Sequence, residues 1–370
     1  MIRFNQIFAI LLSFTFTIAT TSCNSAVSQD EAPQSDPEVK NIIFLIGDGM
    51  GLQQMFAAYT LNGGQLPIDN VDYVGLQKTQ SSNKYITDSA ASGTALACGK
   101  KTDNGMIGVD PEGNELMSIL KIAEKQGLAT GLVSTSGITH ATPASFIANE
   151  KKRSDYENIA ADFLKTDIDL FIGGGLKHFN DRKDGRDLTE DLEKNGYTVA
   201  RSMEEVMNAT SNKLAGFTAE GHNPRTTEGR DDMLPKSTKK AIEMLSKNNN
   251  GFFLMVEGSQ IDWGGHANDE DYVMTETFDF FAAVEEAMNF AAENEETLVV
   301  ITADHETGGM MILDGDMEKK KIKTTFNSKG HTGIMIPVYS YGPKSEYFSG
   351  IYDNTDFKEK FLKAWGFDGI

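Results

Sequence analysis

Short runs of consecutive apolar residues recur along the chain, separated by stretches with the spacing of amphipathic helices. The apolar runs occupy residues 41–47, 127–135, 168–175, 251–258 and 297–305. The amphipathic stretches occupy residues 116–126, 237–247 and 277–294. Strands that are apolar at every position are covered on both faces, as in a parallel sheet. The alternation therefore predicts an α/β fold, with a largely parallel sheet and helices on both faces.

The first 23 residues have the pattern of a bacterial export signal. Arg3 precedes an apolar stretch from Ile7 to Ile18, which is too short to span a membrane comfortably, and small residues follow up to Cys23. Cys23 in this setting resembles the processing site of a lipoprotein, and ordinary signal cleavage nearby is the alternative. We expect an exported protein, either periplasmic or anchored to the outer membrane of a Gram-negative bacterium by a lipid on Cys23.

Composition limits the remaining possibilities. Residues 24–38 are polar and contain proline, which predicts a flexible tether, and residues 39–370 are expected to form a single domain. The net charge of −20 argues against a nucleic-acid-binding surface, and an anionic substrate would need a strong local positive site. Apart from Cys23, the chain contains one cysteine, Cys98. No disulfide framework is expected, and Cys98 is interpreted as a buried core residue.

Polar side chains with metal-binding or catalytic chemistry end or follow four of the apolar runs. These residues are Asp48, His140, Thr142, Glu257, Asp262, His266, Asp304 and His305. In open α/β sheets, functional residues collect beyond the carboxyl ends of the strands. We therefore expect these side chains to lie close together at one edge of the sheet.

The residue types indicate a metal site. Asp262 and His266 are four residues apart, which places them on one face of a helical turn, and His331 lies in the glycine-containing motif "GHTG". Imidazole with carboxylate is a ligand mixture that suits catalytic zinc, whereas purely oxygen donors suit Mg²⁺. A lone histidine is more often structural, and it is the joint occurrence that favours a metal site. His178 and His222 lack such a context and are interpreted as surface or structural residues.

Ser89 stands near the start of a segment of small residues, "ITDSAASGTALACG" (86–99). The segment is expected to form a short helix that ends at Gly99, and a helix N-terminus favours a bound phosphate. The nearest histidine in sequence is His140. A metal that holds the serine as its alkoxide would remove the need for a neighbouring base. The alternative interpretation is a packing helix of small residues.

These motifs together resemble those of the alkaline phosphatases. "ITDSAASGTALACGKKTDNGMIGVD" resembles the family's nucleophile segment, and "GDGMG", "HATPAS", "VEGSQIDWGGHA", "TADHETGG" and "GHTG" match its other motifs in the same order. The resemblance extends over about residues 40–345. It implies a three-layer sandwich and an exported enzyme that hydrolyses small-molecule phosphate monoesters through a phosphoserine, at a site with two Zn²⁺ and one Mg²⁺.

The resemblance also implies a role for each matching residue. Ser89 would be the nucleophile, and Arg153 would clamp the phosphate with its guanidinium. The first zinc would be held by Asp262, His266 and His331, the second by Asp48, Asp304 and His305, and the magnesium by Asp48, Thr142 and Glu257. His140 would lie beside the magnesium, either as a ligand or through a water. Asp88 and Trp263 would lie near the substrate, with Trp263 where other members carry a lysine or histidine.

Two other functions and the oligomeric state stay open. A phosphodiesterase on the same scaffold would generally lack the third-metal carboxylate, here Glu257, and the arginine, here Arg153. A non-catalytic phosphate-binding lipoprotein would need neither nucleophile nor zinc. The family is usually dimeric, but the stretch between His305 and His331 is short where many relatives carry an insertion that builds subunit contacts. A homodimer is therefore one interpretation of this chain.

Overall fold

The computed structural model describes residues 38–367. The predicted export signal with Cys23 lies outside these residues, as does the tether up to residue 37. Within the described part of the chain, no helix is both long and apolar enough to cross a bilayer.

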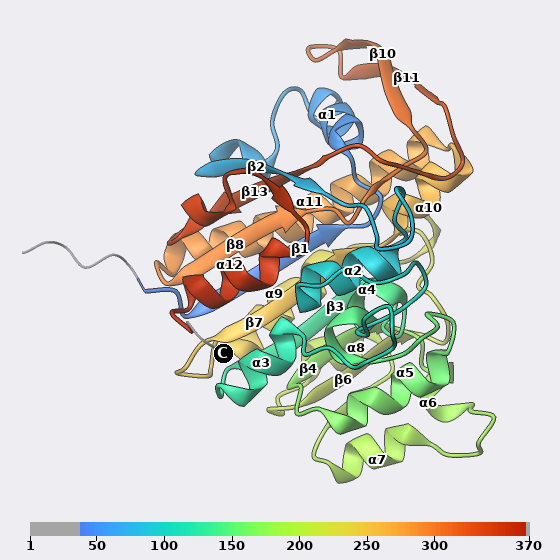
Figure 1. Ribbon diagram of the computed structural model, residues 1–370, viewed down its shortest axis with the longest axis vertical. Coiled ribbons are helices and arrows are strands. Elements are labelled where there is room, and N and C mark those ends of the chain that lie inside the picture. The colour runs from blue at the N-terminus through green and yellow to red at the C-terminus, as the bar shows by residue number, and fades with distance from the viewer. Residues whose placement is uncertain (1–37, 368–370) are drawn as a thin grey trace, which may run out of the picture. The chain divides into compact units, whose positions relative to one another are not determined.

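A ten-stranded sheet forms the centre of the described residues (Figure 1). From one edge to the other it contains β14 (Gly350–Asp353), β2 (Tyr73–Lys78), β13 (Ile336–Tyr341), β8 (Thr297–Thr302), β1 (Asn41–Gly47), β7 (Phe252–Gly258), β3 (Ala129–Gly137), β4 (Leu170–Gly174), β6 (Leu214–Ala219) and β5 (Thr198–Ala200). β13 pairs antiparallel with both of its neighbours, and all other pairs in this sheet are parallel. The predicted α/β fold with a mostly parallel sheet is confirmed.

Helices cover both faces of the sheet and create two apolar cores. One core contains side chains of α2 (Ser89–Cys98), α3 (Ile119–Lys125), α4 (Ala141–Ile147), α5 (Tyr156–Asp162), α6 (Lys177–Asn180), α7 (Leu188–Lys194) and α12 (Asp356–Ala364). The other contains side chains of α1 (Leu52–Leu61), α9 (Met233–Leu245), α10 (Gln260–Ala267) and α11 (Glu270–Glu293), with α8 (Met203–Asn208) at its end. Figure 1 shows the resulting three layers.

The two cores explain why the central strands are apolar at every position. Successive side chains of a strand point to opposite faces. Accordingly, Phe44 of β1 packs in the core with α12, and Leu45 packs in the core with α11. Each of the five predicted strands is present, and the three predicted amphipathic stretches lie in α3, α9 and α11.

Four neighbouring central strands, β8, β1, β7 and β3, end at the same edge of the sheet. Their parallel register pairs Ile46 with Thr302 and Glu257 on either side, and Glu257 with Ser134. The segments that follow these four strands therefore start at nearly the same level along the strand direction. Beyond this edge, the short strands β9 (Glu306–Thr307) and β12 (His331–Thr332) pair with each other. The hairpin of β10 (Met310–Asp316) and β11 (Lys321–Phe326) lies between them in sequence.

Helix α2 has the boundaries that its sequence predicts. The Asp88 carboxylate accepts a hydrogen bond from the Ala91 N–H at 3.0 Å and caps the N-terminus, and Gly99 ends the helix with φ of 69°. Every residue of α2 is buried, including Cys98. A Cβ added at Gly93 would lie 2.8 Å from Ser145 Oγ of α4. The small residues therefore allow α2 to pack closely against α4.

A buried ion cluster fastens the loop 221–230 to α11. Arg230 is 5% exposed and pairs with Glu276 and, at 2.7 Å, with Asp279. Burial raises the pKa of Asp279 to about 6, although Arg230 opposes this shift. The same cluster reaches the loop, because Arg230 Nη1 donates to the Pro224 carbonyl and the Thr226 N–H donates to Glu276. These contacts fix a loop that also borders the site described below.

Replacing Arg230 by methionine is expected to destabilise the protein by about 3–5 kcal/mol, because it leaves two buried carboxyl groups without their counter-charge. Lys236→Met is the matched control, since Lys236 and its partner Asp232 are both exposed and such a pair contributes less than about 1 kcal/mol. Urea unfolding of the two variants measures the difference. Equal losses in both would show that the cluster is not what fastens the loop.

Candidate active site

The polar residues that follow the four central strands converge at the edge where these strands end. Their carboxylate and imidazole groups form three clusters, within each of which the potential ligand atoms lie within 4.8 Å of one another. The clusters are Asp262, His266 and His331; Asp48, Asp304 and His305; and Asp48, His140 and Glu257. Asp48 belongs to two of them, so the clusters form one continuous site.

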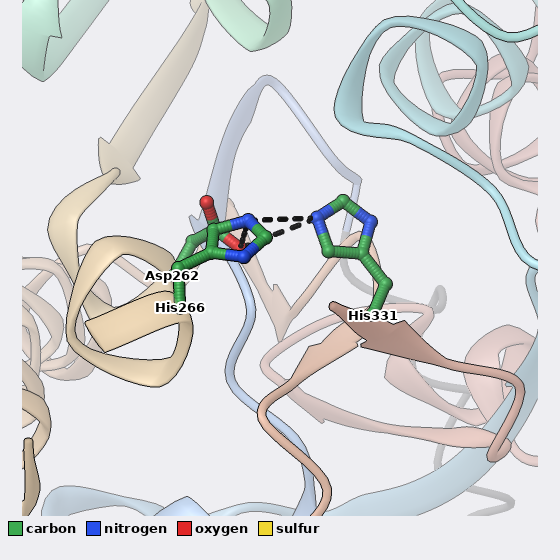
Figure 2. Close-up of side chains that lie close together, drawn as sticks. All are labelled: Asp262, His266 and His331. Atoms are coloured by element: carbon green, nitrogen blue, oxygen red, sulfur yellow. Dashed lines mark hydrogen bonds and ion pairs between the residues drawn. The ribbon is translucent and has the colours of Figure 1, made fainter. Parts of the chain in front are cut away.

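The first cluster is built from one helix and one short strand. Asp262 and His266 project from α10, and His331 faces them from β12 (Figure 2). The Nε2 atoms of His266 and His331 lie 3.3 and 3.5 Å from Asp262 Oδ1, and 3.2 Å from each other.

Hydrogen bonds fix how these two imidazoles are oriented. His266 Nδ1 lies 2.5 Å from the Lys329 carbonyl, and His331 Nδ1 lies 2.8 Å from the Thr87 carbonyl. A carbonyl oxygen only accepts, so both Nδ1 atoms carry the proton and donate. In the neutral rings, the Nε2 lone pairs then face each other and the Asp262 carboxylate, which is the orientation of metal-binding histidines.

The second cluster is completely buried. Asp48, Asp304 and His305 all have 0% exposure. Asp304 Oδ1 accepts hydrogen bonds from the backbone N–H groups of Gly49 and His305, at 3.2 and 2.9 Å. His305 Nε2 lies 3.1 Å from Asp304 Oδ2 and 3.5 Å from Asp48 Oδ1. One imidazole nitrogen thus lies between two carboxylates.

The third cluster is rich in oxygen atoms. Glu257 Oε2 accepts a hydrogen bond from Ser134 Oγ at 2.6 Å, whereas its Oε1 has no hydrogen-bond partner among the described residues. Thr142 is also fully buried, and its hydroxyl likewise has no partner there. His140 contributes a ring nitrogen to this cluster. Oxygen donors therefore predominate here, as the sequence predicted.

Ser89 lies at the junction of the first two clusters. It is the first residue of α2 and is 2% exposed, and its Oγ lies 3.3 Å from His305 Nε2. The ring of His305 stacks on that of His331, with centroids 3.6 Å apart. The structure thus brings Ser89 to the predicted ligands of both zinc ions, although His140 is much nearer in sequence than either histidine.

Arg153 reaches into the site rather than into solvent. Its side chain is 28% exposed, and Nη1 lies 3.1 Å from Asp88 Oδ2. Its Nη2 donates to His140 Nε2 at 3.3 Å. Asp88 also caps α2, so one carboxylate connects the guanidinium to the helix that carries Ser89. From its local sequence, "NEKKRSD", Arg153 would have been interpreted as a surface charge.

Burial and mutual repulsion disfavour ionisation of several carboxyl groups in the site. Burial raises the pKa of Asp48 well above its usual range, and the charge of Asp304 adds to the shift. Burial also raises the pKa of Asp304, to about 8, with Asp262 adding to it. The pKa of Glu257 is raised by burial too, and hydroxyl groups such as that of Ser134 offset part of the effect.

The pKa values of Asp262 and of the imidazoles are shifted by different causes. Burial opposes ionisation of Asp262, but the hydrogen bond with His266 and the neighbouring imidazoles hold its pKa below the usual range. The hydrogen bond to Asp262 raises the pKa of His266 to about 9. Burial lowers the pKa of His305 well below its ordinary value, and His331 adds to this shift. His305 is therefore a neutral imidazole, the form that binds metals.

The donor set fits metal ions. Both carboxylate oxygens of Asp48, Oδ2 of Asp304, Oε1 of Glu257 and the Thr142 hydroxyl are buried without a hydrogen-bond partner in the described part of the chain. Buried polar atoms in proteins are normally paired or bind a metal, and ionised carboxylates this close together repel. Cations would satisfy the oxygen atoms and offset the repulsion. The first two clusters suit Zn²⁺, and the third, in which oxygen donors predominate, suits Mg²⁺.

Trp263 and His222 complete one side of the site. The Trp263 ring packs against His140 and His222, with centroids 6.2 and 5.0 Å apart. His222 also packs against His140 at 5.4 Å. The sequence analysis missed the position of His222, because nothing in "AEGHNP" distinguishes it from a loop residue. His178 has the structural role expected of it, with Nδ1 2.7 Å from Thr139 Oγ1 and its ring stacked on Tyr156.

The fold and this site define a class of protein: an α/β protein with a buried serine and an arginine beside groups that suit metal ions. Comparison with known families identifies which one. The family model for alkaline phosphatase matches residues 39–319. The chain belongs to the alkaline phosphatase family, which is metal-dependent and acts on small-molecule phosphate monoesters. It is therefore an enzyme, a phosphoric monoester hydrolase.

Individual relatives agree with this assignment. The chain is 35% identical to alkaline phosphatase 3 of Bacillus subtilis (strain 168), over 96% of each chain. It is 33% identical to the alkaline phosphatase of Escherichia coli (strain K12), over 90% of this chain and 87% of that one. A mutant alkaline phosphatase of the Antarctic bacterium TAB5, solved with Mg bound in its M3 site, matches with a TM-score of 0.85 and 40% identity, over 90% of this chain and 99% of that one.

Asp48→Asn is expected to have opposite effects with and without metal. Without metal, and at an alkaline pH at which Asp48 would have to ionise despite its raised pKa, the variant should unfold at a higher temperature than the wild type, because it removes a buried negative charge from the cluster. With added Zn²⁺ and Mg²⁺, the wild type should gain stability by binding them, and the variant should gain less because two clusters lose an anionic ligand. Calorimetry in a chelator and then with each metal measures both effects.

Glu204→Gln, on the exposed surface of α8, is the control and should respond to metal as the wild type does. A lower metal-free unfolding temperature in Asp48→Asn, or an undiminished response to metal, would contradict this interpretation of the clusters.

Proposed function

We propose that this chain is an exported alkaline phosphatase that hydrolyses phosphate monoesters to an alcohol and inorganic phosphate through a phosphoserine at Ser89. The observation that carries the proposal is the position of Ser89. It begins a helix, its Oγ lies 3.3 Å from His305 Nε2 where two candidate metal clusters meet, and Arg153 is bound to the capping residue Asp88. A serine nucleophile, a phosphate-binding guanidinium and candidate metal ligands thus occur in one site.

The proposed cofactors are two Zn²⁺ and one Mg²⁺. Asp262, His266 and His331 would hold one zinc, Asp48, Asp304 and His305 the other, and Asp48, Thr142 and Glu257 the magnesium. Mg is bound in the M3 site of two TAB5 mutants in which a histidine is replaced by glutamate or aspartate. When bound, such ions neutralise phosphate charge and lower the pKa of a hydroxyl or water. His140 Nε2 receives the Arg153 N–H, so His140 is better placed to position the guanidinium than to bind magnesium through that nitrogen.

Arg153 supplies the positive charge that an anionic substrate needs in a chain of net charge −20. Its guanidinium is planar and can donate two parallel hydrogen bonds to two phosphate oxygens. Asp88 and His140 hold the guanidinium from two sides. The substrate phosphate would therefore be bound in one orientation beside the N-terminus of α2, whose backbone N–H groups favour an anion.

The reaction then proceeds in two transfers. Ser89 Oγ attacks phosphorus in line with the ester oxygen: the Ser89–phosphorus bond forms, the ester P–O bond breaks, and the alcohol leaves with the proton that Ser89 loses. A water next attacks the phosphoserine from the opposite side, so inorganic phosphate leaves and Ser89 regains its proton. Because phosphoryl transfer needs little besides position and charge, Ser89 and Arg153 contribute mainly by being held in place.

The two alternative functions are less well supported. Glu257 and Arg153 are both in the site, and a phosphodiesterase on this scaffold is expected to lack them. A phosphate-binding lipoprotein without activity would not need a buried serine beside the candidate ligands. Membership of the alkaline phosphatase family agrees with hydrolysis of monoesters.

Export, a lipid anchor at Cys23 and a homodimer remain proposals. The first two rest on the pattern of residues 1–23, outside the described residues. Labelling of the protein with a radioactive fatty acid, lost in Cys23→Ala, tests the anchor. Light scattering of the protein in solution tests the homodimer.

Ser89→Ala is expected to lower hydrolysis of an aryl phosphate monoester by at least roughly 1,000-fold, because the variant lacks the hydroxyl that would form the proposed phosphoserine. Acid quenching during turnover of a ³²P-labelled monoester should trap label on the wild type and none on the variant. Ser92→Ala changes a second buried serine of the same helix and should still be labelled. Turnover by Ser89→Ala at the wild-type rate, or a preference for the matching diester, would refute the proposal.

Trp263→Lys is expected to bind inorganic phosphate several-fold more tightly, because it adds a positive charge beside His140 near the proposed phosphate position. Inhibition of monoester hydrolysis by phosphate measures the change. Trp263→Phe keeps a neutral ring and should leave inhibition close to that of the wild type. Equal inhibition of all three proteins would mean that position 263 does not influence phosphate release.

A further inference from the structure

Three aromatic rings enclose the polar groups on one side of the site. The rings of His140, His222 and Trp263 all meet edge to face, with interplanar angles of 89°, 77° and 90° and centroid distances between 5.0 and 6.2 Å. Edge-to-face pairs at 4.5–7 Å are a favourable arrangement of aromatic rings. Each ring of the trio therefore restrains the other two.

His140 is the ring of this trio that contacts the catalytic machinery. It is 8% exposed, one of its nitrogens belongs to the cluster with Asp48 and Glu257, and its Nε2 accepts the Nη2–H of Arg153. The direction of this ring therefore determines where the Arg153 guanidinium is held. The backbone of His140 is fixed by a turn in which its N–H donates to the Gly137 carbonyl. Its ring orientation depends on the two rings that pack against it.

The ring of His222 is fixed by the end of strand β3. The Gly137 N–H donates to His222 Nδ1 at 3.0 Å, so in the neutral ring Nε2 carries the proton. The two residues are 85 positions apart in sequence. This hydrogen bond to the end of β3 fixes the orientation of the His222 ring.

The loop behind His222 is fastened to the helix that carries Trp263. Asn223 accepts a hydrogen bond from Thr218 Oγ1 at 2.7 Å, and its carbonyl accepts one from Gln260 Nε2 at 3.0 Å. Gln260 is held in turn by the Tyr272 hydroxyl at 2.7 Å. Gln260 and Trp263 lie one turn apart on α10. The loop and Trp263 are thus parts of one rigid assembly, so the contact between His222 and Trp263 is held from both sides.

We propose that His222 is a positioning residue of the phosphatase reaction: its ring braces Trp263 and His140, and through His140 it holds the Arg153 guanidinium in the direction that binds the substrate phosphate. His222 acts through other residues and does not itself contact the reacting atoms. The proposal rests on the monoester hydrolysis described above. A failure of that activity would appear as an inactive wild type, before any variant is compared.

His222→Ala tests the proposal, with His178→Ala as the matched control. His178 is a second imidazole on a neighbouring segment; within the described residues, its ring nitrogen bonds to Thr139 and its ring stacks on Tyr156, not on His140 or Trp263. His222→Ala is expected to raise KM and weaken phosphate inhibition by at least about fivefold, the lower end of what the loss of two ring pairs implies. The effect on kcat should be smaller than that on KM. His178→Ala should change either constant by less than about twofold.

Two further variants distinguish a positioning role of His222 from a general effect on protein stability. His222→Phe keeps the ring but not the Nδ1 acceptor, and it should recover part of the loss in phosphate affinity. In an Arg153→Ala background, His222→Ala should have almost no further effect on phosphate inhibition, because the group it positions is gone. The unfolding temperature is measured for every variant. A loss of phosphate affinity that merely follows a loss of stability would overturn the proposal.

Fluorescence gives a readout that does not depend on activity. The chain contains two tryptophans, Trp263 and Trp365, so a Trp365→Phe background reports Trp263 alone. Removal of the His222 ring is expected to make Trp263 more accessible to acrylamide, whereas His178→Ala should not. Should Trp365→Phe fail to fold, the difference in quenching between the wild type and Trp263→Phe gives the same information.

Unchanged phosphate inhibition and KM in His222→Ala would overturn the proposal, as would an equal loss in His178→Ala or full additivity of His222→Ala and Arg153→Ala. Unchanged quenching of Trp263 would also contradict it, because the ring contact would then not restrain the indole.

Discussion

The crowding of buried carboxylates at one edge of the sheet is the constraint on which the rest of the site depends. Asp48, Glu257 and Asp304 are wholly buried, and Asp262 is 5% exposed. Charged groups cannot be transferred from water to such a place at low cost unless they are paired. Metal ions provide that pairing, and the imidazoles beside the carboxylates influence which metal ion binds. This need for a counter-charge explains three features of the site: the unpartnered oxygen atoms, the converging Nε2 lone pairs and the shifted pKa values.

The sheet holds these carboxylates close together despite their mutual repulsion. Four parallel strands end side by side, and two separate apolar cores hold each of them from both faces. The carboxylates are thus attached to a scaffold that cannot relax to let them separate. Further restraints come from outside the sheet: the cap of α2, the paired strands β9 and β12, and the loop 221–230, which the buried Arg230 cluster fastens to α11. A site for phosphoryl transfer needs this rigidity, since position accounts for much of its catalysis.

The sequence predicted the centre of the fold and most of the candidate ligand groups, for a local reason. Buried parallel strands are apolar throughout, so their ends are visible, and Asp48, Asp304 and Glu257 occur there. The edge strands were not recognised, because β5 has three residues and β14 four, too few for a pattern. β13 was not among the predicted strands, and its antiparallel pairing depends on a return of the chain that no local pattern shows.

Other parts of the site required information beyond local pattern. The local sequence of Ser89 left a nucleophile and a packing helix both open, and the proposed role of Arg153 came from the family resemblance, because its own surroundings indicate a surface charge. Neither the local sequence pattern nor the family resemblance indicated a role for His222. Its contacts are with Gly137, His140 and Trp263, which are distant in the chain, and only the folded sheet brings them together.

Anomalous diffraction at the zinc absorption edge, from crystals of catalytically active enzyme, tests the central claim most directly. The account predicts two strong peaks, one among Asp262, His266 and His331 and the other among Asp48, Asp304 and His305, with no zinc peak at Thr142 and Glu257. Active crystals without a metal peak in either of the first two clusters would contradict it, because the buried carboxylates would then be tolerated without the ions that the account requires.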